Sequence, residues 1–133
     1  ADLVRLYTRD EKKRSGLAKY AWGGAQVFMH KKPALKPWQF DPAAYDLIIL
    51  GTPVWAASPA PPMQSFLSEA KISGKKIALF ICHMGGKGEA LKKFKSLLAD
   101  NTVAGETDFI KPLAGSRDAV KEQLARWLKS LGL

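Results

Sequence analysis

Few residues of this chain have side chains suited to catalysis or to metal binding. The sequence of 133 residues contains one cysteine, Cys82, and two histidines, His30 and His83. Their spacing matches no metal-ligand pattern, so we expect no metal site. It also gives no Ser/His/Asp or Cys/His arrangement, and we assign no catalytic residue. Cys82 ends an apolar run, which favours a buried small side chain over a reactive thiol, because a reactive thiol needs an exposed, electropositive setting.

Two loops are better placed to bind a ligand than any single side chain. Residues 51–61 are rich in proline and follow an apolar run at residues 45–50; we call them the proline loop. Residues 83–88, HMGGKG, follow an apolar run at residues 76–82; we call them the glycine loop. A third candidate, residues 8–15, is almost wholly polar. In open α/β sheets, ligands bind beyond the carboxyl ends of the strands, where loops of this kind would meet.

Strands and helices alternate along the sequence. The runs at residues 45–50 and 76–82 predict strands covered on both faces, residues 102–110 predict an edge strand, and residues 1–8 predict a further strand. Apolar residues recur at helical spacing in residues 16–30 and in three stripes: Met63, Phe66, Leu67 and Ala70; Leu91, Phe94, Leu97 and Leu98; and Val120, Leu124, Trp127, Leu128 and Leu131. This alternation predicts an α/β fold, a parallel sheet with helices on both faces.

Local signals mark where some of these elements begin and end. Pro53, Pro59, Pro61 and Pro62 predict an interruption of regular structure that lasts until a helix starts, because proline is tolerated in a first helical turn. Ser116 and Gly132 are suited to cap the last helix at its two ends. We interpret Trp22, Trp38 and Trp127 as packing residues.

Three segments carry a resemblance to a known family. YDLIILGTPVWA at residues 45–56, followed by SPAPP at residues 58–62, strongly resembles the middle segment of flavodoxin-like proteins. GKKIALFIC at residues 74–82, with the glycine loop, resembles their next strand and loop. Weaker matches at residues 15–36 resemble an insertion in one branch of the family. The resemblance covers essentially the whole chain and implies one domain over residues 1–133, a three-layer flavodoxin-like parallel sheet truncated to about four strands.

The resemblance also implies an FMN site, because two loops of that family sandwich the isoalloxazine ring. Carried over, the first loop supplies Thr52, Pro53, Val54, Trp55 and Ala56, and the second supplies Cys82, His83, Met84, Gly85 and Gly86. An aromatic side chain can stack on a flavin, main-chain amides can hydrogen-bond its ring, and glycines allow the backbone to approach closely. Two alternatives remain open: Trp55 packed on its own prolines, and His83 facing solvent.

The phosphate side of that site has no counterpart in this sequence. Flavodoxins begin with an apolar strand and a Ser/Thr/Gly-rich loop that holds the FMN phosphate at a helix N-terminus. Residues 1–6 match the family's second strand instead, so we expect the first βα unit and the phosphate anchor to be absent. In the order 2-1-3-4-5 this leaves a gap beside the strand at residues 45–50.

Three arrangements would repair that gap. Residues 1–8 could close up against the strand at residues 45–50, a second copy could cover the gap, or the sequence could be a fragment of a longer product. An unpaired strand edge invites pairing with another chain, which favours self-association through this edge.

The implied function is FMN-dependent electron transfer or a quinone-reductase-like redox role. The alternative is a flavin-free truncated remnant that serves as an interaction or assembly module. The formal net charge is +9, whereas flavodoxin electron shuttles are typically acidic, so a redox partner with an acidic surface would suit this chain.

The composition also bears on membrane insertion, nucleic-acid binding and cellular location. No apolar run approaches the roughly 20 residues that span a bilayer, so we expect no membrane insertion. Trp22 and Trp38 lie among lysines but in no nucleic-acid-binding motif, and we expect no nucleic-acid partner. No leader opens the sequence, and the single cysteine suits a reducing compartment, which together favour a cytoplasmic location.

Overall fold

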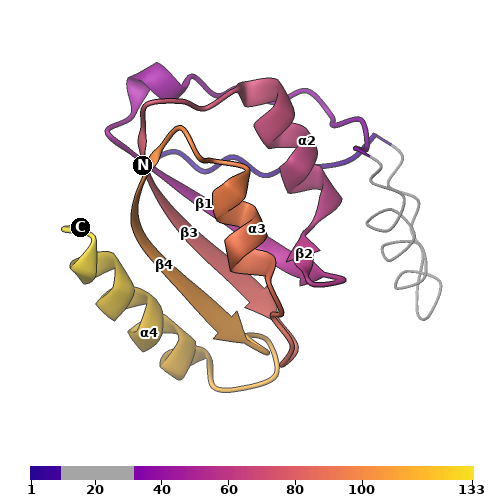
Figure 1. Cartoon of the computed structure of the whole chain (residues 1–133). Helices are drawn as coiled ribbons and strands as arrows, with labels where there is room; N and C mark the ends of the chain where they lie inside the picture. The colour runs from indigo at the N-terminus through magenta and orange to yellow at the C-terminus, as the bar shows by residue number, and fades with distance from the viewer. Residues whose placement is uncertain (10–31) are drawn as a thin grey trace.

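The computed structural model describes residues 1–9 and 32–133 (Figure 1). The helix predicted at residues 16–30, with Trp22 and His30, lies outside the described residues. The elements are η1 (Pro42–Ala44), β1 (Leu47–Trp55), β2 (Ser58–Pro59), α2 (Pro61–Ala70), β3 (Lys76–His83), α3 (Ala90–Ser96), β4 (Thr102–Ile110) and α4 (Arg117–Ser130).

The strands form one four-stranded sheet in the order β2-β1-β3-β4. β1, β3 and β4 are parallel, and the two-residue β2 is antiparallel to β1. The β1–β3 pairing runs from Leu47↔Lys76 to Pro53↔Cys82, and the β3–β4 pairing ends at His83↔Ile110. The predicted parallel α/β sheet of about four strands is therefore confirmed.

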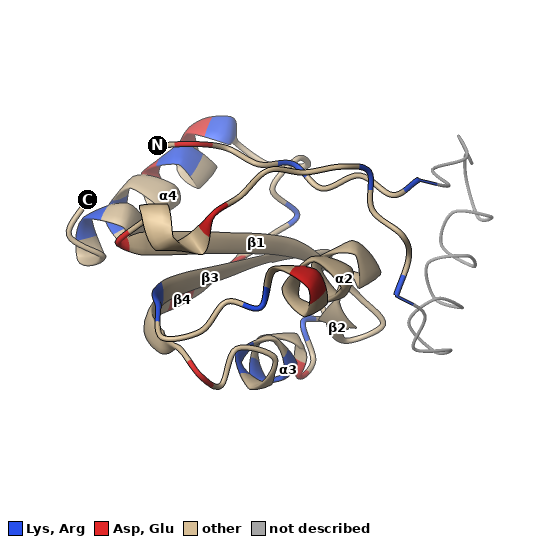
Figure 2. Ribbon diagram, turned by 90° about the horizontal axis from the view of Figure 1, so that it is seen from above, with Lys and Arg blue, Asp and Glu red and all other residues tan. Residues whose placement is uncertain are grey.

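Helices cover both faces of the sheet, which gives three layers. Figure 2 shows α4 on one side of the strands and α3 on the other. On the α2–α3 side, Ile77, Leu79 and Ile81 of β3 are fully buried together with Phe94. On the opposite side, Ala78 packs against Trp127 of α4. Because successive strand residues point to opposite faces, the continuous apolar run of β3 is what allows helices on both sides.

The predicted helix ends are largely confirmed. At the start of α4, Ser116 Oγ accepts a hydrogen bond of 3.3 Å from the N–H of Ala119. Gly132 follows the end of α4 with a φ of +84°. α3 is shorter than its apolar stripe predicts, because Leu97 and Leu98 lie beyond its last residue. No helix in the described part of the chain has both the length and the apolar character needed to cross a membrane.

The strand predicted at residues 1–8 is wrong. This segment forms a single antiparallel bridge, Thr8↔Leu35, flanked by hydrogen bonds that join Arg9 to Ala34 and Lys36 to Tyr7. Proline fixes φ at about −65°, away from the φ of about −140° of an antiparallel strand, so Pro33 and Pro37 limit an extended pairing on either side of Leu35. Leu3 at the start of the segment is 82% exposed. Residues 1–8 therefore do not close up against β1 as a strand.

The expected interruption at the prolines is also wrong in part. β1 continues through Pro53 to Trp55, then turns at Ala56 and Ala57 and pairs back through β2, with Trp55 opposite Ser58. An edge strand tolerates proline because the missing N–H breaks no ladder in the middle of a sheet. Regular structure therefore extends into the proline loop, and α2 starts at Pro61 as expected.

Candidate functional site

The structure brings the proline loop and the glycine loop together at the carboxyl edge of the sheet. Pro53 and Cys82 are direct partners in the β1–β3 pairing, so the two loops leave adjacent strands at the same level. Farther along, a Cβ atom added to Gly88 would lie 2.7 Å from the Cβ of Ala57. The loops are therefore in contact, as their places in the sequence predict. Of the third candidate, residues 8–15, only Thr8 and Arg9 are described, and both contact residues 34–35 instead.

Local hydrogen bonds hold the proline loop. The buried Thr52 hydroxyl accepts from the N–H of Ala60 at 3.1 Å and donates to the carbonyl of Pro53 at 3.1 Å. The amide of Gln64 in α2 donates to the carbonyl of Pro59 at 2.8 Å. These bonds connect both ends of the loop to each other and to the helix that follows it.

The tip of the proline loop is a two-residue turn. Ala56 and Ala57 have φ values of +48° and +56°, the left-handed region that suits a tight hairpin but costs energy for a residue with a Cβ. Pro53 and Ala56 are exposed, and Val54 and Trp55 are half-buried. Of the predicted residues from Thr52 to Ala56, only Thr52 is therefore buried, and the other four are at least partly exposed.

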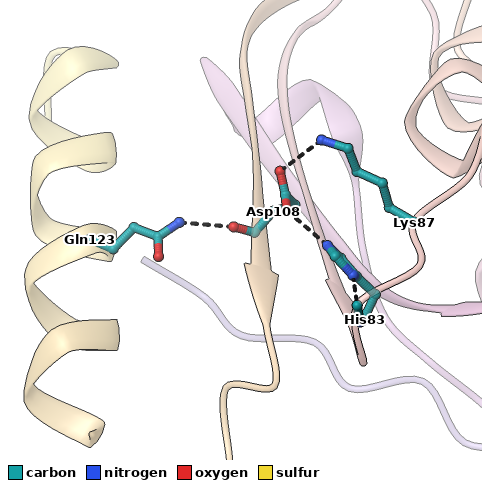
Figure 3. A network of polar contacts seen from close by, with 5 residues as sticks. His83, Lys87, Asp108 and Gln123 are labelled. Atoms are coloured by element: carbon teal, nitrogen blue, oxygen red, sulfur yellow. Dashed lines mark hydrogen bonds and ion pairs between the residues drawn. The ribbon is translucent and has the colours of Figure 1, made fainter. Parts of the chain in front are cut away.

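The glycine loop is held by the side chain of His83, the last residue of β3. His83 is 7% exposed, so a solvent-facing role is wrong for this histidine. Its Nδ1 accepts from the N–H of Gly85 at 3.1 Å, and its Nε2 lies 2.8 Å from Oδ2 of Asp108 (Figure 3). Because a main-chain N–H can only donate, Nδ1 carries the lone pair. The imidazole proton therefore sits on Nε2 and is donated to Asp108.

Asp108 of β4 is a residue of the candidate site that the sequence did not indicate. Its Oδ1 accepts from Lys87 Nζ at 3.1 Å, and its main-chain carbonyl accepts from Gln123 of α4 at 2.8 Å. The hydrogen bond from His83, with further help from Lys87, holds the pKa of the Asp108 carboxyl below its usual range. The available signal was a carboxylate near the carboxyl end of a strand, the edge where α/β proteins place their sites.

Cys82 is half-buried, and burial raises the pKa of its thiol. A raised pKa keeps the group as a thiol at neutral pH, in line with the interpretation that Cys82 is not a reactive nucleophile. Within residues 1–9 and 32–133, no group of His, Cys, Asp and Glu side chains is arranged to hold a metal ion.

The outer part of the glycine loop is exposed. Met84, Gly85 and Gly86 are exposed, and a Cβ on either glycine would meet no atom within 4 Å. Main-chain groups of the glycine loop are therefore accessible, and in the proline loop Pro53 is exposed and Trp55 is half-buried. Exposed peptide groups and a partly exposed aromatic side chain are groups that can bind an aromatic ring system with polar edges.

Comparison with solved structures supports the fold on which this site is built. A flavoprotein of Lactobacillus acidophilus NCFM, crystallised in complex with FMN, superposes with a TM-score of 0.70 over 95% of this chain and 79% of its own, at 20% identity. The chain has a flavodoxin-like fold. The apo form of the Lactobacillus flavoprotein, solved by NMR, matches with a TM-score of 0.56 over 83% of this chain and 74% of its own, at 21% identity.

A third structure agrees with these two. A protein of Bacteroides eggerthii DSM 20697, provisionally described as a flavoprotein, matches with a TM-score of 0.62 at 17% identity. The match covers 83% of this chain and 69% of that protein. No protein-family model matches the chain, and no curated protein sequence matches it significantly.

Proposed function

We propose that this protein binds the isoalloxazine ring of FMN between the proline loop and the glycine loop and uses it in electron transfer or in quinone-reductase-like reduction. The observation that carries the proposal is the meeting of the two loops, with Pro53 opposite Cys82 and Gly88 against Ala57. Ring contacts come from Thr52, Pro53, Val54, Trp55 and Ala56 on one side and from Cys82, His83, Met84, Gly85 and Gly86 on the other.

Each loop has a distinct part in this proposal. Trp55 offers an aromatic face for stacking, and the exposed peptides at residues 84–86 offer hydrogen bonds to the polar edge of the ring. When bound, the flavin supplies the capacity to accept and release electrons. The chain's own residues orient the ring and shield one part of it from water.

In this proposal the ring of FMN contributes more to the affinity than its phosphate does. A helix N-terminus holds a phosphate through free N–H groups, but α2, the helix after the proline loop, starts with Pro61 and Pro62, which carry none. The proline loop therefore offers no free helix N-terminus to the phosphate of FMN, and we expect riboflavin, which lacks the phosphate, to bind about as tightly as FMN.

Titration of the purified protein with FMN and with riboflavin tests the proposal, with flavin fluorescence and absorbance near ~450 nm as the signals. Both flavins should change signal in a saturable way, with dissociation constants within about threefold of each other, which is under 1 kcal/mol. Trp55→Leu should weaken both, whereas Trp38→Leu, a matched change at a tryptophan packed on Phe66, should not. Absence of any saturable signal from the folded protein contradicts flavin binding.

The redox role includes a partner with an acidic surface. The formal net charge is +9, and Lys87, Lys93 and Lys111 are exposed near the carboxyl edge of the sheet. Association with an acidic electron donor should slow as salt rises, since screening shortens the reach of these charges. A rate that is independent of salt would count against such a partner. We further propose a reducing compartment such as the cytoplasm, because the sequence has a single cysteine, Cys82, and so cannot form a disulfide within itself.

A second candidate function, an assembly module, is favoured by the edge of β1. In the described part of the chain, β2 pairs with this edge only at Val54 and Trp55, so no strand pairs with residues 47–52 on that side. Leu47–Trp55 contains no charged residue, although charges on an edge strand are a common protection against pairing. A second strand that pairs with β1 therefore meets no charged side chain on β1 itself, and we commit to a second copy of this chain as the occupant.

The oligomeric state tests this second candidate. Ile49 of β1 and Val103 of β4 are both 37% exposed and lie on the two outer long strands of the sheet, so they form a matched pair. If copies pair through β1, analytical ultracentrifugation should find a dimer that Ile49→Lys dissociates and Val103→Lys does not. A monomer at all concentrations, or dissociation by Val103→Lys alone, contradicts it.

A further inference from the structure

We propose that Asp108 is a positioning residue for the flavin site, acting through His83 to fix the peptide between Met84 and Gly85. This inference rests on the proposed flavin function. It concerns a residue that does not touch the ring but determines which main-chain groups of the glycine loop face it.

The relay consists of two hydrogen bonds in series. The carboxylate of Asp108 receives the Nε2 proton of His83 at 2.8 Å, and Nδ1 on the other side of the same ring receives the Gly85 N–H at 3.1 Å (Figure 3). Each bond fixes the next, because the acceptor at Asp108 selects the tautomer that leaves Nδ1 free to accept. The imidazole is buried, so it has little freedom to adopt another orientation.

The glycine loop depends on this relay because it has few other restraints. Gly85 has a φ of +126°, a conformation that side-chain-bearing residues rarely adopt, and no atom would lie within 4 Å of a Cβ there. Among the described residues, the bond to His83 is the one hydrogen bond that residues 84–86 make.

The fixed peptide has a definite consequence for a ligand. A trans peptide is planar, with its C=O and N–H pointing in opposite directions. Because the Gly85 N–H points inward to His83, the Met84 carbonyl of the same peptide points away from His83. The loop therefore offers an acceptor toward the open side, suited to an N–H group on the polar edge of a flavin ring.

Asp108 is itself held from two further directions. Lys87 Nζ lies 3.1 Å from Oδ1, and Gln123 of α4 donates to the main-chain carbonyl at 2.8 Å. These contacts connect the glycine loop to β4 and α4. Lys87 contacts the carboxylate but not the imidazole, so its loss should weaken the relay less than loss of the carboxylate itself.

Three variants isolate the relay. Asp108→Val removes the acceptor for His83, Asp108→Asn keeps a neutral acceptor of the same shape, and Glu106→Val removes a carboxylate two residues away on the same strand. Glu106 pairs with Lys95 at 2.9 Å and makes no contact with the glycine loop. Should Asp108→Val fail to fold, Asp108→Ala removes the same acceptor with a smaller side chain.

Two readouts separate the relay from the flavin function. In the flavin-free protein, the amide NMR signal of Gly85 should move in Asp108→Val and stay near its original position in Asp108→Asn and Glu106→Val. In flavin titrations, Asp108→Val should weaken riboflavin binding about tenfold, the loss expected for one hydrogen bond, while the other two variants change it less than about threefold.

The outcomes are distinguishable. An unmoved Gly85 signal in Asp108→Val overturns the relay even where the wild-type protein binds flavin. A moved Gly85 signal with unchanged flavin affinity overturns the positioning role but leaves the flavin function intact. If the wild-type protein binds no flavin, the proposed function fails and the positioning role fails with it, whatever the Gly85 signal shows.

Discussion

The two loops of the candidate site are stabilised in different ways. The proline loop is held from within, by the Thr52 hydroxyl bonded to Ala60 and by the prolines that restrict its backbone. The glycine loop is held from outside, by His83 at its base and by Asp108 on a strand 25 residues later. The first loop is therefore specified by its own short sequence, whereas the second requires the sheet to be formed.

This difference indicates how each loop should respond to change. A loop held by local bonds loses its shape when a bond inside it is removed. A loop held by a distant carboxylate loses its shape when that carboxylate is substituted or protonated. For the glycine loop this residue is Asp108, which lies far from the loop in the sequence. Both loops meet at Gly88 and Ala57, where a single atom added to either side would disturb the pair.

The largest effect is expected at that meeting point. Gly88→Ala places a Cβ 2.7 Å from the Cβ of Ala57 and imposes a side chain on a residue with a φ of +51°. We expect a loss of roughly 2–4 kcal/mol of unfolding free energy, from overpacking and left-handed strain together. Urea denaturation measures it. Gly86→Ala is the control, since its Cβ would meet no atom within 4 Å; equal costs for the two would show that the loops do not touch.

The next largest effect is expected inside the proline loop. Thr52→Val keeps the shape of a buried side chain but removes one of the two acceptors of the Ala60 N–H, which retains the Pro53 carbonyl at 3.2 Å. We expect a loss of about 0.5–1.5 kcal/mol, the contribution of one hydrogen bond. Thr102→Val, at an exposed threonine at the start of β4, should change stability by less than about 0.5 kcal/mol. A Thr52→Val protein as stable as the wild type would mean that this loop does not depend on its internal bond.

A smaller, pH-dependent effect is expected at the glycine loop. The folded-state pKa of Asp108 is lowered, so its carboxylate stabilises the fold above the ordinary Asp pKa of about 3.9, and this contribution is lost as pH falls through the lower folded-state value. The contribution is modest, because the side chain is 25% exposed. The stability difference between wild type and Asp108→Asn should therefore be largest at neutral pH and shrink in acid. A difference that grows toward low pH would contradict the assigned direction.

The smallest effect is expected at the turn of the proline loop. Ala57→Gly relieves a φ of +56° and should raise stability by up to about 1 kcal/mol, after the entropy that glycine adds to the unfolded chain. Ala60→Gly, at a φ of −58°, relieves no such strain and should lower stability. Thermal unfolding of the two variants side by side is sufficient, and a destabilised Ala57→Gly would indicate that the turn is not strained.

The same contrast explains what the sequence could and could not predict. β1 and β3 were predictable because continuous apolar runs need cover on both faces. The extension of β1 through Pro53 to Trp55 was not, because the prolines predict an interruption there. His83 was not predictable as a buried residue, since the carboxylate that satisfies its buried ring belongs to Asp108, 25 positions away. Residues 1–8 looked like a strand because Leu3, Val4 and Leu6 are apolar, but the segment pairs only through the bridge between Thr8 and Leu35. The apolar pattern of a segment does not show which other segment it will pair with.

If the two loops form one ring-binding site, a flavin must perturb both of them. A ¹H–¹⁵N NMR titration with riboflavin reports on each loop separately. We expect the perturbed amides to fall in both loops, at Thr52, Val54, Trp55 and Ala56 and at residues 82–86, while amides along residues 47–50 of β1 stay unchanged. Perturbation of one loop alone, or of neither, would contradict it.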